Sequence, residues 1–158
     1  TGGRVLIRQR RIIRRFRGLI CHRRTHLQAS TEALKTGLSK SPANPYAWAR
    51  LAYLGLRLEG EVVDAKDALI MSLFTGPFER SLVHSRIEYA LAIWHQLDAS
   101  QQTMIHEQIV LLARIDRRRL YAIARQNPNY RVIALTALAP HPERQAALRA
   151  ALKNKPAK

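Results

Sequence analysis

Residues 45–77 read PYAWARLAYLGLRLEGEVVDAKDALIMSLFTGP, and this stretch decides the fold. Its apolar side chains recur at helical spacing rather than in alternation, which predicts α-helices and not strands. Two breaks interrupt the pattern, a glycine at residues 59–60 and a glycine followed by proline at residues 76–77. We therefore expect one helix over about 46–58 and a second over about 62–74, joined by a tight turn.

The same helical pattern continues on both sides of this pair. Near the N-terminus it begins at Val5, where an apolar stripe is surrounded by arginines. Asp98 with Gln101 forms a candidate capping box, and Asp116 is a second candidate N-cap. Further helices are expected over about 31–40, 79–96, 98–115, 116–126, 130–138 and 143–152. The sequence therefore predicts an all-α protein built from short antiparallel helix pairs.

Residues 30–77 also carry a specific register. Small residues at Ala52, Ala65 and Ser72 allow two helices to approach closely, while Trp48 and Leu69 fill the space between pairs. With Leu51 and Pro77, these positions resemble the first-helix and second-helix signatures of the tetratricopeptide repeat (TPR) family. The resemblance implies antiparallel helix pairs stacked as a short TPR-like α-solenoid.

Three regions follow from this interpretation. A basic amphipathic N-terminal helix is expected over 1–29, a TPR-like helical domain over 30–152, and a basic tail over 153–158. The terminal regions are set apart by their charge, because residues 1–31 contain nine arginines and Glu32 is the first acid.

The TPR resemblance implies a non-enzymatic scaffold or adaptor, because the family holds peptides or partner proteins on a face built from first helices. The matching partner-binding positions on this chain are Tyr46, Arg50, Tyr53 and Arg57, with Arg15 and Arg23 added upstream. Arginines and tyrosines at these positions suit an acidic protein or peptide partner. The alternative is that the two tyrosines are ordinary packing residues.

The charge of the chain leaves two other classes of function open. Its 158 residues contain 27 Lys and Arg against 11 Asp and Glu, a formal charge of +16. Such a field attracts phosphate and anionic lipid as well as acidic proteins. The alternatives are therefore an RNA-binding component of a ribonucleoprotein particle and a domain docked on an anionic membrane by its N-terminal helix. The candidate anionic-surface residues are Arg8, Arg11, Arg14, Arg15, Arg117 and Arg118.

Several kinds of chemistry find no support in the sequence. The single cysteine, Cys21, excludes an intrachain disulfide scaffold. Cys21, His22 and His26 supply too few ligands at the right spacing for a zinc site. No nucleophile elbow or phosphate-binding loop occurs, so no enzyme activity, metal or cofactor is expected. No apolar run reaches the roughly 18 residues that a membrane span needs. The chain begins at Thr1 without Met, which leaves an upstream anchor or leader, and hence the compartment, open.

Overall fold

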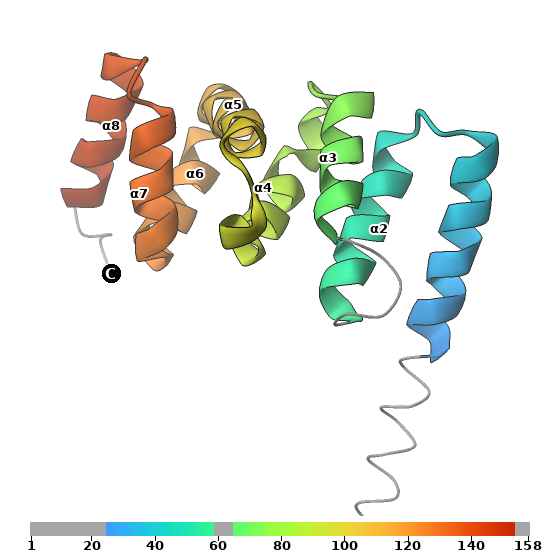
Figure 1. Ribbon diagram of the computed structural model, residues 1–158. Coiled ribbons are helices and arrows are strands. Elements are labelled where there is room, and N and C mark those ends of the chain that lie inside the picture. Colours follow the sequence, from blue (N-terminus) through green and yellow to red (C-terminus); the bar gives the residue numbers. More distant parts are fainter. Residues whose placement is uncertain (1–24, 59–64, 154–158) are drawn as a thin grey trace, which may run out of the picture.

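The computed structural model describes residues 25–58 and 65–153, and in these ranges the regular secondary structure is helical, without strands. The predicted all-α class is confirmed. Figure 1 shows the helices following one another in chain order across the molecule, from the blue helix at one side to α8 at the other.

The described elements begin with a helix whose described part spans residues 25–40. It is followed by α2 (Pro45–Arg57), α3 (Ala65–Thr75), η1 (Arg80–Leu82), α4 (Val83–Ala92), η2 (Trp94–Gln96), α5 (Ala99–Ile115), α6 (Arg117–Gln126), α7 (Pro128–Ala137) and α8 (Pro142–Lys153), where η denotes a short 3-10 helix.

The helices form two layers. From α2 onward, each α-helix packs against the one that follows it or is joined to it by a short connection, and three pairs of alternate helices also touch. Thus α2 contacts α4, α6 contacts α8, and α5 contacts α7. The contact of His84 with Arg119 links α4 to α6, so one layer contains α2, α4, α6 and α8, and α5 and α7 lie in the other. Because of this arrangement, outward-facing side chains of α2, α4 and α6 come to the same side of the molecule.

Polar residues at the helix starts explain most of the boundaries. The Asp98 side chain accepts a hydrogen bond from the backbone N–H of Gln101, whose side chain in turn accepts one from the Asp98 backbone. Asp116 caps α6 through a single bond, which its side chain accepts from the N–H of Arg119. Both predicted caps are confirmed. Each satisfies a donor that the first helical turn would otherwise leave without a partner.

The predicted continuous helix over residues 79–96 is wrong. The structure divides this segment into η1, α4 and η2, with a break at Ile93, where φ is −120° and ψ is 20°. The Ile93 side chain is buried, and the break brings the Trp94 ring within 5.8 Å of the His106 ring of α5. Packing between the two helices therefore outweighs the local helical preference.

A buried arginine joins α2, α3 and α4. Arg86 of α4 is 0% exposed, and its guanidinium donates to the Ser72 hydroxyl (3.0 Å), the Ser72 carbonyl and the Gly76 carbonyl (2.8 Å). The Ser72 hydroxyl donates onward to the Pro45 carbonyl at 2.8 Å. Gly76 lies against the same proline, and a Cβ at this position would lie 2.9 Å from Pro45 Cγ. This junction, formed by Arg86, Ser72, Gly76 and Pro45, fixes α2 relative to α4.

The predicted close-packing positions fall into two groups. Ala52, Leu69 and Ser72 are fully buried, whereas Ala65 and Trp48 are only partly buried. The predicted helix over 31–40 begins earlier, because residues 25–40 are helical. The N-terminal apolar stripe and most of the basic tail lie outside the described residues, so the proposed division of the chain stays a prediction.

Candidate functional site

Four predicted binding residues lie on α2 at spacings of four, three and four residues, which places them along one face of the helix. The structure brings three of them together. The guanidinium carbon of Arg50 lies 5.4 Å from the centroid of the Tyr53 ring, and that of Arg57 lies 5.3 Å from it. Both distances are within the range in which a cation is attracted to an aromatic face. Tyr53 thus holds two arginines in place.

The site extends from α2 to α4 through a second tyrosine. The rings of Tyr53 and Tyr89 lie 6.1 Å apart at an angle of 44°, a tilted aromatic contact. Burial raises the pKa of the Tyr89 hydroxyl above its ordinary value, so the group is a neutral donor and acceptor at physiological pH. The spacing of residues within α2 gave no signal for Tyr89, because the contact depends on the packing of α4 beside α2.

His84 continues this surface towards α6. Its Nδ1 atom lies 3.2 Å from Arg119 Nη2, and its Nε2 atom lies 3.4 Å from Glu88 Oε1. Since a guanidinium only donates, Nδ1 accepts and the proton of the neutral ring is on Nε2, facing the carboxylate. Burial is the main cause of a lowered His84 pKa, and Glu88 acts in the opposite direction.

We call the surface formed by Arg50, Tyr53, Arg57, Tyr89, His84 and Arg119 the arginine–tyrosine face. Arg50 and Arg57 are exposed, and neither forms an ion pair with a carboxylate within residues 25–58 and 65–153. No carboxylate of these ranges therefore neutralises their charges. Chemically, two fixed guanidinium groups and neighbouring phenol hydroxyls can bind carboxylates by charge-assisted hydrogen bonds.

Tyr46 has a different environment. Its hydroxyl lies 3.0 Å from the Ser81 hydroxyl, which donates to Glu79 at 2.9 Å. Hydrogen bonding by Tyr46, and secondarily by Ser81, lowers the pKa of the Glu79 carboxyl. The Tyr46 ring is still 50% exposed. Tyr46 thus links the start of α2 to η1 and is not part of the Tyr53 cluster.

The remaining predicted site residues are not brought into this cluster by any observed contact. Arg117 and Arg118 are exposed in the first turn of α6. Arg117 lines a small pocket with Tyr121 and Arg144. Arg8, Arg11, Arg14, Arg15 and Arg23 lie outside the described residues.

Two other features are absent from the described ranges. No group of three His, Cys, Asp or Glu side chains there is arranged to hold a metal ion. None of the described helices has the length and apolar character needed to cross a membrane. Comparison of the chain with protein-family models, with curated proteins and with solved structures finds no match.

Proposed function

We propose that this chain is a non-enzymatic scaffold that binds an acidic partner protein through the arginine–tyrosine face. The observation that carries the proposal is the pair of exposed arginines held over Tyr53 with no carboxylate to neutralise them in the described part of the chain. Arginine and tyrosine are both enriched in protein–protein interfaces relative to the rest of the protein surface.

The proposal includes a TPR-like stacking of helix pairs. Three features support it: the register of residues 30–77, the packing of each helix on the next from α2 to α7, and the contacts between alternate helices. In such an arrangement, α2, α4 and α6 serve as the first helices of successive pairs. The face that they share then becomes the partner-binding surface, as in other stacked helical repeats.

The partner chemistry follows from the geometry of the cations. Tyr53 is flanked by Arg50 and Arg57, and Arg119 adds a third guanidinium across His84. Several guanidiniums on neighbouring helices fit an extended segment with spaced Asp or Glu side chains better than a single small anion. Arginine forks bind carboxylates through two parallel hydrogen bonds.

The test is a titration of the full chain with a fluorescein-labelled poly-glutamate peptide, followed by anisotropy at about 150 mM salt. The variant R50E/R57E should lower affinity at least tenfold. The matched control is K40E/R149E, which makes the same charge change at two exposed positions away from the face. It should change affinity less than threefold.

Two other ligands distinguish the alternatives in the same assay. Single-stranded RNA tests the ribonucleoprotein interpretation, and vesicles rich in phosphatidylserine test the membrane interpretation. An equal loss in both double variants would show attraction by net charge alone and would contradict the proposal. Tight RNA binding with a steep salt dependence, unaffected by R50E/R57E, would replace it with nucleic-acid binding.

A further inference from the structure

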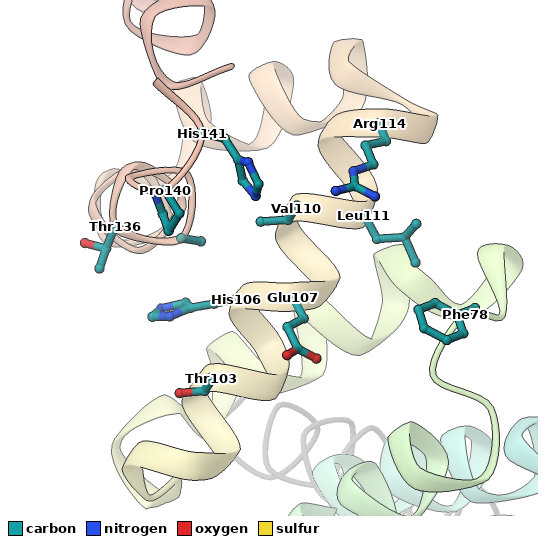
Figure 2. Close-up of a pocket in the computed structure, with 11 residues that line it drawn as sticks. Phe78, Thr103, His106, Glu107, Val110, Leu111, Arg114, Thr136, Pro140 and His141 are labelled. Carbon is teal, nitrogen blue, oxygen red and sulfur yellow. The ribbon is translucent and has the colours of Figure 1, made fainter. Parts of the chain in front are cut away.

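A groove lies on α5, in the layer that does not contain the arginine–tyrosine face. Its volume is about 570 Å³. Figure 2 shows Val110 and Leu111 of α5 in its middle, with Phe78 beyond them on one side and Pro140 and His141 on the other. A groove of this size accommodates one or two large side chains.

Both walls of the groove are held by hydrogen bonds. Gln108 of α5 is buried, and its amide nitrogen donates to the Pro77 carbonyl at 2.8 Å, which fixes the loop that carries Phe78. On the other side, the His141 backbone N–H donates to the Leu138 carbonyl at 2.9 Å in the turn after α7. The groove is therefore formed before any ligand binds, which lowers the entropic cost of binding.

The middle of the groove is apolar, because Val110 and Leu111 line it there. Phe78 is 82% exposed, so almost all of its ring is available to a ligand. The His106 ring packs on Trp94, and burial lowers the His106 pKa, so the ring is neutral at physiological pH. An exposed aromatic side chain beside a preformed apolar groove is typical of a protein interaction site.

Two charges of opposite sign flank this apolar centre. Glu107 and Arg114 both line the groove and lie seven residues apart on α5, about 10 Å along the helix. Neither forms an ion pair in the described ranges. A complementary ligand therefore needs a base and an acid two helical turns apart, with large apolar side chains between them.

We propose that the α5 groove is a second docking site, which binds an amphipathic helix of a partner protein. The occupant carries a basic residue facing Glu107, an acidic residue facing Arg114, and one or two large aliphatic side chains between Phe78 and Pro140. This recognition mode is that of a helix in a groove. It does not depend on the arginine–tyrosine face, which lies on other helices.

The probe is a synthetic alanine-based helical peptide with Lys at position i, Leu at i+3 and i+4, and Glu at i+7. Added to the ¹⁵N-labelled full chain, it should shift the amide signals of α5 and of the turn after α7. A peptide with alanine at both leucine positions should bind at least tenfold more weakly. A peptide with lysine at both charged positions should also bind more weakly, because it places a cation beside Arg114.

The matched protein variants are F78A and F74A. Both phenylalanines are exposed, Phe74 at 68%, so neither change disturbs the core. Only Phe78 lines the groove. F78A should weaken binding about tenfold, and F74A less than twofold. The proposal is overturned if millimolar peptide leaves the α5 signals unshifted, if the two variants weaken binding equally, or if the shifts fall on α2 and α4 instead.

Discussion

Arg86 and the pair Arg50 and Arg57 are chemically identical residues in opposite environments. Arg86 is fully buried and directs its guanidinium at two backbone carbonyls and a hydroxyl. Arg50 and Arg57 are exposed and contact only the Tyr53 ring among the described interactions. The first arginine joins three helices, whereas the other two contact a ring of their own helix.

The difference shows what a buried cation needs in place of a carboxylate. The last turn of α3 has carbonyl groups without intrahelical donors, and the negative end of the helix dipole lies there. Arg86 donates to the Ser72 carbonyl in this turn and to the Gly76 carbonyl just beyond it, which also accept from Thr75 Oγ1 and the Glu79 N–H. Burial lowers the Arg86 pKa to about 10, so the group is still charged at neutral pH. Within residues 25–58 and 65–153, neither Arg50 nor Arg57 donates to a backbone carbonyl.

The largest effect is expected for Arg86→Met, which keeps much of the side-chain volume. It removes three hydrogen bonds, and the Ser72 and Gly76 carbonyls then keep only the longer bonds from Thr75 Oγ1 (3.5 Å) and from the Glu79 N–H (3.2 Å). We expect a loss of about 3 kcal/mol in the free energy of unfolding, since hydrogen bonds to charged groups contribute most when buried. Urea unfolding followed by circular dichroism measures it.

Arg50→Met is the control for this change. The residue is exposed, so its replacement should alter the free energy of unfolding by less than about 0.5 kcal/mol. If the two substitutions cost the same, the distinction between a joining arginine and an available arginine is wrong.

The second prediction tests the close contact within the same junction. Gly76→Ala places a methyl group 2.9 Å from Pro45 Cγ and 3.0 Å from Pro45 Cβ. The rigid proline ring has to shift with the start of α2, at a cost of about 2 kcal/mol in unfolding free energy. Thermal or urea unfolding checks this value.

A second glycine provides the matched control. A Cβ at Gly37 meets no atom within 4 Å, and this residue lies in the helix of residues 25–40. Gly37→Ala should therefore stabilise the protein by about 0.5–1 kcal/mol through helix propensity alone. A loss of stability at Gly37, or none at Gly76, would show that the close approach of Gly76 to Pro45 does not matter.

The same contrast explains how much the sequence could reveal. Helix boundaries that depend on local groups, such as the Asp98 capping box and the Asp116 cap, were predicted correctly. The breaks around α4 were not, because Ile93 and Trp94 adopt their conformations through packing on α5. Local pattern also placed Arg50, Tyr53 and Arg57 on one face of α2.

Long-range contacts account for the remaining parts of the candidate sites. Tyr89 joins Tyr53, and His84 joins Arg119, only because α4 packs beside α2 and next to α6. The Gln108 bond that positions Phe78 spans 31 residues of sequence. Arg86 lies four residues from the buried Leu82 and Ala90, but this spacing does not reveal which groups of α3 its guanidinium binds.

The third prediction concerns the exposed side of the comparison. Tyr53→Leu keeps an apolar side chain but removes the aromatic face that holds Arg50 and Arg57. Exposed cation–π contacts contribute little, so we expect a loss of about 1 kcal/mol or less in unfolding free energy. A larger loss would place Tyr53 with the structural residues of the junction. Tyr53→Phe keeps the ring and should leave stability nearly unchanged.

The smallest effect is expected from pH. Burial lowers the pKa values of His84 and His106 below the ordinary 6.5. Between the lowered native pKa values and about pH 6.5, the unfolded chain therefore binds more protons than the native protein, and the free energy of unfolding rises with pH. The contribution is complete above about pH 6.5 and is lost as the pH falls towards the native pKa values. At His84, protonation also removes the acceptor for Arg119, while attraction to Glu88 partly offsets this loss.

Urea midpoints measured across this range should fall less in H84Q/H106Q than in the parent chain. H95Q, at an exposed position, should behave like the parent. A parent chain whose stability does not fall between about pH 7 and pH 5 would show that His84 is not a buried neutral acceptor, and the arginine–tyrosine face would then end at Tyr89.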